Sequence, residues 1–341
     1  MNRWREKSVV IAALVLGGSP GARAADEACR IGDGQRIILQ LADEKTSLNK
    51  AKGTKVENES DNYHVRISIG GMPAYSVQVD TGSMGIVVSR SAVPDALWNA
   101  ASDRPGQMYY SSSDRLMLGR YVTAPVKLGV PRDYKGAESG GDYPTTASID
   151  VLAVECSCHT HPQTTGSSST SAQEPLTGES LSCKQLEGTS AQLGGKSATL
   201  NRCVPARTGM MGVGFARGGH LSSAKNPFLR LEAMDKGLMH PGYIIRGRAH
   251  ELELGLTKNG TADFKFVQLQ LQSQAGSEPP SSNPGPGTLR YVKEWEAPRA
   301  CVDFPGQKSE YRQFCGTLLM DTGIDEMLLT VPGNMRPPNL V

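Results

Sequence analysis

The feature that most constrains this chain is a short internal repeat. Residues 77–83 read VQVDTGS, and residues 318–324 read LLMDTGI. In each copy an apolar segment leads into Asp-Thr-Gly, and further aliphatic residues follow. One Asp-Thr-Gly carries little information, because Asp and Gly are common in turns. Two copies, each at the end of an apolar strand, predict that the chain pairs Asp80 with Asp321; the alternative is two unrelated turns after strands.

Two carboxyl groups in hydrogen-bond contact have a distinctive chemistry. They cannot both ionise cheaply, so they share one proton. The ionised member can take a proton from water while the protonated member polarises a carbonyl group. Each threonine hydroxyl can bond to the backbone of the other copy, and each glycine allows a tight turn beneath its acid. The pattern therefore predicts two catalytic residues, Asp80 and Asp321, supported by Thr81, Gly82, Thr322 and Gly323.

The rest of the sequence is typical of an all-β protein. Its 38 Gly and 21 Pro in 341 residues indicate many turns and short strands. A helix is predicted at 227–238, because Phe228, Leu231 and Met234 recur every three residues and Gly237 provides a stop. The segments predicted as strands are 65–69, 75–79, 86–89, 121–128, 147–154, 264–271 and 317–320. The segments predicted as loops or linkers are 25–61, 134–200 and 273–288.

The first 24 residues have the pattern of a secretory signal peptide. A basic start is followed by a short apolar run and by small residues ending in Ala24, after which we predict cleavage. The product is then secreted or periplasmic. The apolar run is too short to span a bilayer, so no stable membrane anchor is expected. The net charge of +2 gives no basic field, so no nucleic-acid partner is expected.

The seven cysteines all lie beyond the predicted cleavage site, where disulfides persist. The stretch 156–161 (CSCHTH) invites a metal site, but its spacing is wrong for a zinc finger, and we expect neither metal nor cofactor. We predict instead that Cys156, Cys158, Cys183 and Cys203 staple a long loop. Cys301 and Cys315 are predicted to form a local disulfide, so Cys29 is predicted to be the one cysteine outside these disulfides.

The order of these parts resembles the pepsin-like aspartic endopeptidases, colinearly from about residue 62 to residue 332. Residues 62–73 look like the hairpin that this family places before its first acid, and 80–85 (DTGSMG) match the first catalytic loop. Residues 209–215 (GMMGVGF) are similar to the strand that threads beneath that loop, and 227–238 resemble the helix that follows. The Cys301 and Cys315 pair is similar to a disulfide before the second acid of animal pepsins.

The resemblance implies a bilobal double-psi β-barrel fold and an exported endopeptidase that acts on peptides or proteins. The N-terminal lobe would span 62–245 with a Cys-containing insertion at 134–205, and 246–341 would form a partial, truncated C-terminal lobe. The family closes a hairpin flap over the substrate with a tyrosine. The flap residue here is Tyr109 or Tyr110, and the serine after Tyr110 favours that residue.

Two departures from the family bear on activity. In the family a Ser or Thr normally follows Asp-Thr-Gly, and its hydroxyl bonds the catalytic carboxylate. Ser83 occupies this position in the first copy, whereas Ile324 occupies it in the second. The loss of this hydroxyl is expected to raise the pKa of Asp321. Only 18 residues follow Gly323, and they contain no second threading strand. The alternative is therefore a catalytically impaired pepsin-fold protein that binds peptides or a protein partner. Residues 25–61 are predicted to be an arm with one strand at 37–41, or a short propeptide.

Overall fold

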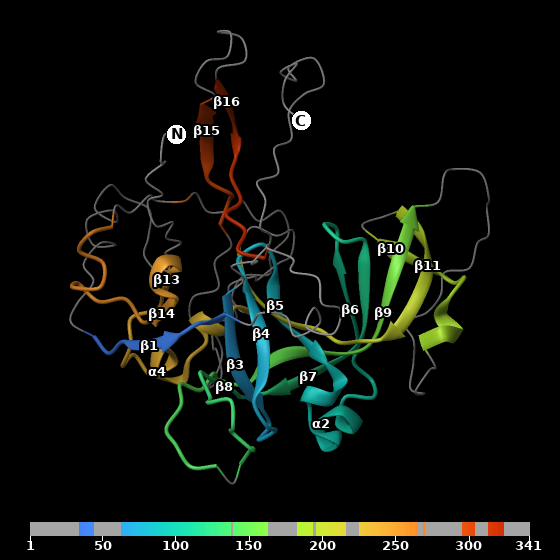
Figure 1. Cartoon of the computed structure of the whole chain (residues 1–341), viewed down its shortest axis with the longest axis horizontal. Helices are drawn as coiled ribbons and strands as arrows, with labels where there is room; N and C mark the ends of the chain where they lie inside the picture. The colour runs from blue at the N-terminus through green and yellow to red at the C-terminus, as the bar shows by residue number, and fades with distance from the viewer. Residues whose placement is uncertain are drawn as a thin grey trace, which may run out of the picture.

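A computed structural model describes residues 34–43, 63–137, 139–162, 183–193, 196–215, 225–264, 269, 295–303 and 313–323. These residues are mostly β, as predicted, and the strands form one large mixed sheet and two small sheets (Figure 1). Among them, no helix is long and apolar enough to cross a membrane. The predicted signal peptide and Cys29 lie outside the described residues.

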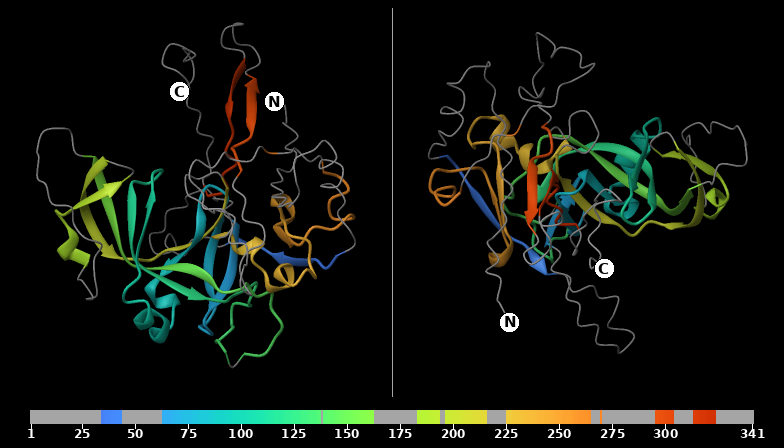
Figure 2. Two further views of the ribbon diagram at one scale, coloured as in Figure 1. Left: turned by 180° about the vertical axis from the view of Figure 1, so that it is seen from behind. Right: turned by 90° about the horizontal axis from the view of Figure 1, so that it is seen from above.

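The large sheet curls around the main core and runs in the order β10-β11-β9-β5-β12-β4-β3-β2, with β6, β7 and β8 attached to it (Figures 1 and 2). Its strands are β2 (Ala42–Asp43), β3 (Tyr63–Ile69), β4 (Tyr75–Asp80), β5 (Met84–Ser89), β6 (Pro105–Tyr110), β7 (Arg115–Ala124), β8 (Val126–Leu128), β9 (Ile149–Pro162), β10 (Ser190–Leu193), β11 (Lys196–Pro205) and β12 (Gly209–Val213). The helical segments around this sheet are η2 (Arg90–Ala92), α2 (Asp95–Ala100), η3 (Cys183–Leu186), η4 (Pro227–Leu229) and α4 (Glu232–Asp235).

Alternating apolar residues build the core where the sequence predicts them. Val65 and Ile67 on β3 and Val77 and Val79 on β4 are all at most 1% exposed. The strand predicted at 121–128 is divided in two, because Pro125 has no N–H group to donate to the sheet.

The continuous helix predicted at 227–238 is wrong. The chain forms the 3-10 turn η4 and then the short helix α4. Arg230 and Leu231 interrupt them, because the Arg230 carbonyl accepts from the Ala147 N–H at 2.7 Å and Leu231 forms a β-bridge with Thr146. The periodic residues Phe228, Leu231 and Met234 are nevertheless all buried. The spacing therefore identified which residues pack into the core but not the backbone that carries them.

A three-stranded sheet joins the N-terminal arm to a later hairpin. Its strands are β1 (Ile37–Gln40), β14 (Glu251–Leu254) and β13 (Tyr243–Arg246), with the turn η5 (Gly247–Ala249) in the hairpin. The strand predicted at 37–41 is therefore present. The buried Glu253 carboxylate accepts hydrogen bonds from Arg246 at 3.2 Å and Arg36 at 3.5 Å, which ties the arm to the hairpin. Whether residues 25–61 act as a propeptide stays a prediction.

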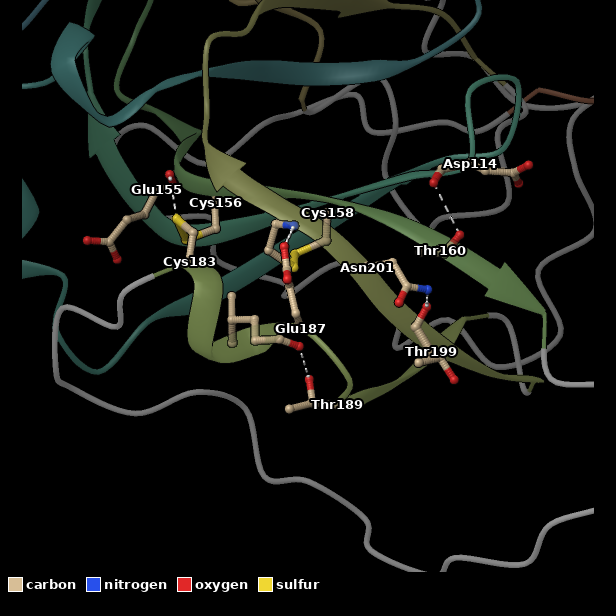
Figure 3. The surroundings of a disulfide bond; sticks show 12 residues. Asp114, Glu155, Cys156, Cys158, Thr160, Cys183, Glu187, Thr189, Thr199 and Asn201 are labelled. Carbon is tan, nitrogen blue, oxygen red and sulfur yellow. Dashed lines mark hydrogen bonds between the residues drawn. A yellow bond between two sulfur atoms is a disulfide. The ribbon is translucent and has the colours of Figure 1, made fainter.

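The strand predicted at 147–154, inside the predicted loop 134–200, is present as the first part of β9. Much of the rest of that predicted loop is wrong, because the second half of β9, η3, β10 and the start of β11 lie in it. The disulfides Cys156–Cys183 and Cys158–Cys203 hold these strands together (Figure 3). The four half-cystines form a small satellite core with Leu116, Leu186 and Leu200. Disulfides and a few leucines thus replace the long apolar runs that strand prediction depends on.

The third disulfide, Cys301–Cys315, joins opposite residues of the hairpin β15 (Arg299–Asp303) and β16 (Gln313–Thr317). This hairpin projects from the large sheet (Figures 1 and 2). The strand predicted at 317–320 is wrong beyond Thr317. The Leu318 N–H still donates to the Pro298 carbonyl, but Pro298 has no N–H group to return the bond, so the pairing ends there. The strand predicted at 264–271 lies almost entirely outside the described residues.

Mild reduction of the native protein is expected to open Cys301–Cys315 before the other two disulfides. Both of its cysteines are exposed, whereas the four satellite cysteines are at most 8% exposed, and thiol–disulfide exchange requires access. Alkylation at increasing times, followed by peptide mass mapping, measures the order. Labelling of Cys158 or Cys203 as early as that of Cys301 would contradict the burial pattern.

Candidate active site

The first Asp-Thr-Gly turn connects β4 to β5, and β12 runs between these two strands. β12 pairs in parallel with β4, where Gly212 lies opposite Asp80, and antiparallel with β5. The Gly214 N–H donates to the Ser83 carbonyl at 2.8 Å, and a Cβ at residue 214 would collide with the Thr81 carbonyl. The strand predicted to thread beneath the acid loop is therefore in this position, and glycine allows its close approach.

Thr81 and Thr322 join the two turns, although they are 241 positions apart. The Thr81 N–H donates to Thr322 Oγ1 at 3.1 Å, and the Thr322 N–H donates to Thr81 Oγ1 at 3.0 Å. Each hydroxyl in turn donates to a backbone carbonyl of the other copy, Thr81 to Met320 at 2.5 Å and Thr322 to Val79 at 2.7 Å. The four bonds are reciprocal, so the two copies of the repeat face each other as equivalent halves.

The two carboxyl groups lie between these turns. Each acid accepts a hydrogen bond at Oδ1 from the glycine two residues later, Asp80 from Gly82 at 2.7 Å and Asp321 from Gly323 at 2.8 Å. Each glycine also faces the other acid. A Cβ at residue 323 would lie 2.6 Å from Asp80 Oδ1, and one at residue 82 would collide with the Asp321 carboxylate. The structure thus brings together the two acids that the repeat predicts as a pair.

The environment of Asp80 raises its pKa to about 6. Burial is the largest cause, since Asp80 is only 5% exposed, and the charge and hydrogen bond of Asp321 act in the same direction. The Ser83 hydroxyl and the Gly82 N–H oppose the shift, because both stabilise the charged form. At mildly acidic pH Asp80 therefore keeps a proton beside a second carboxyl group.

The two candidate flap tyrosines point in different directions, as neighbours on a strand do. Tyr110 lies beside Asp80 and Ser83; burial first, and then the negative charge of Asp80, raise the pKa of Tyr110. The Tyr109 hydroxyl instead donates to Asp114 Oδ1 at 2.8 Å, and its ring packs on the satellite core. Of the two, the structure brings Tyr110 to Asp80.

Three features of the site were not predicted from sequence. Gln78 donates from Nε2 to the Gly323 carbonyl at 3.2 Å, which links β4 to the second turn. Met108 and Met210, together with Tyr110 itself, pack in an apolar cluster around Val87 and Leu152. The hairpin β6–β7 is held to β9, where the Thr160 hydroxyl donates to the Asp114 carbonyl at 3.2 Å (Figure 3). Gln78 could have been noticed in the sequence, because it is a polar amide in the apolar segment before Asp-Thr-Gly, where the second copy has a leucine.

The site offers two neighbouring carboxyl groups, and the described residues contain no group of three or more side chains suited to a metal ion. The cysteines of 156–161 are joined to Cys183 and Cys203 in disulfides. Ile324 lies outside the described residues, so its effect stays a prediction. No protein-family model matches this chain, and no curated protein matches it.

Proposed function

We propose that this chain is an exported aspartic-type endopeptidase with a pepsin-like fold. The observation that carries the proposal is the reciprocal bonding of the two Asp-Thr-Gly turns, which sets Asp80 and Asp321 against each other. The strand β12 beneath the first turn and the tyrosine hairpin beside Asp80 support the same fold. The substrate class is a peptide or protein, and the proposal requires neither metal nor cofactor.

The proposed reaction uses water as the nucleophile. The pair holds one proton, and the raised pKa of Asp80 assigns that proton to Asp80 at mildly acidic pH. The ionised partner takes a proton from water as the water oxygen attacks the peptide carbonyl carbon, and Asp80 gives its proton to the carbonyl oxygen. The tetrahedral intermediate then breaks its C–N bond as the proton taken from water passes to the leaving amine. One hydroxyl group of the intermediate returns a proton to Asp80, which restores the pair. Tyr110 would cover the substrate from the hairpin side.

Purified protein is expected to cleave unfolded polypeptides in acid and to lose this activity as the pH rises through about 6. The reason is that the protonated member of the pair, Asp80, ionises in this range. The measurement is the pH dependence of peptide cleavage, with a statine-type inhibitor as the control for mechanism. Cleavage that persists undiminished at pH 8, or that the inhibitor does not block, would contradict a proton shared by two acids.

The second candidate is a pepsin-fold protein that binds peptides without cleaving them. It is favoured by Ile324, which has no hydroxyl to offer the second acid. Retention of an immobilised peptide library with no product at any pH would support this reading instead.

Export is the proposed setting for either function. The three disulfides require an oxidising compartment, and the predicted signal peptide would supply the route. N-terminal sequencing of protein purified from the periplasm or the medium tests cleavage after Ala24.

A further inference from the structure

Gln78 makes a contact that sets it apart from the other residues of the repeat. It lies on β4 two residues before Asp80, so both side chains are on the same face of the strand. Its Nε2 donates to the Gly323 carbonyl at 3.2 Å. Its backbone is fixed from both sides, since Gln78 lies opposite His64 on β3 and opposite Met210 on β12. An amide on this rigid strand therefore reaches across to the turn that carries the second acid.

This bond has no counterpart in the other half of the site. The threonine bonds between the two turns come in reciprocal pairs, and each turn also has the same bond from its glycine to its own acid. The residue equivalent to Gln78 in the second copy is Leu319, whose side chain cannot donate a hydrogen bond. The link from residue 78 to residue 323 is thus one-sided, and it supports the second turn alone.

The bond also completes the anchoring of Gly323. The N–H of this glycine donates to Asp321 Oδ1, and its carbonyl accepts from Gln78. The two peptide units on either side of the Gly323 Cα are therefore each held by one hydrogen bond. Because a Cβ at residue 323 would come within 2.6 Å of Asp80 Oδ1, small rotations of this glycine would change the spacing of the two acids.

We propose that Gln78 is a positioning residue for the second acid, acting through the Gly323 backbone to hold the Asp321 carboxylate against Asp80. Its consequence for catalysis rests on the proposed endopeptidase function. Gln78 itself bonds to neither carboxylate in the hydrogen bonds that the structure shows, and it offers the turn a side-chain donor, which the isoleucine at 324 lacks.

The first test is Gln78→Leu, which keeps the bulk and removes the donor. We expect kcat to fall about tenfold, the size of one lost hydrogen bond, with KM within about twofold of the wild type. The alkaline limb of the pH profile should move to lower pH, since a looser Asp321 raises the pKa of Asp80 less. Gln40→Leu is the matched control, because it also removes one glutamine bond from a strand, between the exposed Gln40 and Glu251.

The second test is Gln78→Glu, which can donate only when the new carboxyl group is protonated. Its activity relative to the wild type should recover as the pH falls below about 4. The titratable groups around position 78 are Asp80 on the same face of β4, Asp321 across the site, Tyr110 beside Asp80 and His64 opposite on β3. Recovery within one folded protein separates positioning from a folding defect. A constant ratio to the wild type from pH 6 to pH 3 would overturn the proposal.

A third measurement does not require activity. The Asp80 carboxyl titration, followed by ¹³C NMR in the intact protein, should have its midpoint near 6 in the wild type and in Gln40→Leu, and a lower midpoint in Gln78→Leu. An unchanged midpoint in Gln78→Leu would overturn the positioning role. If the midpoint moves but the wild-type protein cleaves nothing, the positioning role stands and the endopeptidase function fails.

Discussion

The variant Asp80→Asn is expected to cleave peptides roughly 10⁴-fold more slowly than the wild type. At neutral pH it is expected to be more stable than the wild type. The loss of rate follows because an amide can neither give the shared proton to the carbonyl oxygen nor take a proton back from a hydroxyl group of the tetrahedral intermediate. The Asn side-chain oxygen can still accept the Gly82 N–H bond that holds the turn. Peptide cleavage and chemical unfolding measured on the same preparation test both halves of the prediction.

The gain in stability follows from the sign of the Asp80 shift. The pKa is about 6 in the folded chain and 3.8 for an ordinary Asp, so the folded state binds the proton more tightly. The free energy of unfolding of the wild type should therefore fall by roughly 3 kcal/mol in all as the pH rises from about 4 to about 6. Asp80→Asn should show none of this fall. Asp95→Asn, at an exposed acid paired with Arg90, is the control and should retain both activity and the wild-type pH dependence. Equal loss of stability and activity in Asp80→Asn would mean that the acid has a structural role.

The repeat predicted the site better than periodicity predicted the fold. Asp-Thr-Gly specifies its own contacts, since the glycine N–H donates to the acid of its own turn. The threonine N–H and hydroxyl bond to the second copy of the same turn, which returns equivalent bonds. The strand 317–320 failed for the same reason, because Met320 offers its carbonyl to Thr81 and not to a neighbouring strand. The helix predicted at 227–238 was wrong because the Arg230 carbonyl accepts a hydrogen bond from the Ala147 N–H and not from a residue one helical turn later. Both failures come from distant partners that no local pattern contains.

The satellite core around β9 shows a second limit on what could be predicted from the sequence. Its strands are rich in Ser, Thr, His and Cys, and their stability depends on which cysteines pair. The cysteines were expected to staple this region, and they do, but the sequence did not specify the pairing or the strands that the pairing supports. In the site, the choice between Tyr109 and Tyr110 likewise depended on which face of β6 meets Asp80, and that is decided by the register of β6 with β7.

Gly82→Ala is expected to disrupt the acid pair without an effect on the rest of the fold. A Cβ at this residue would collide with the Asp321 carboxylate, whose atoms cannot yield without leaving Asp80. A displacement of about 1 Å costs on the order of 100-fold in rate, and we expect at least that loss of cleavage. The pKa of Asp80 should fall as well, because the charge and hydrogen bond of Asp321 both help to raise it. Gly140→Ala makes the same chemical change where nothing lies within 4 Å, and it should leave cleavage unchanged.

A comparison of Gly82→Ala in two backgrounds, wild type and Asp321→Ala, identifies the group with which the new Cβ collides. In otherwise wild-type protein, Gly82→Ala should lower the free energy of unfolding by about 1–3 kcal/mol, the usual cost of overpacking. In an Asp321→Ala background the carboxylate is absent, so the same substitution should cost less than about 0.5 kcal/mol. The double-mutant cycle measures this difference by chemical denaturation, with the disulfides intact. Equal costs in the two backgrounds would mean that residue 82 collides with some other group, and that the two turns are farther apart than a shared proton allows.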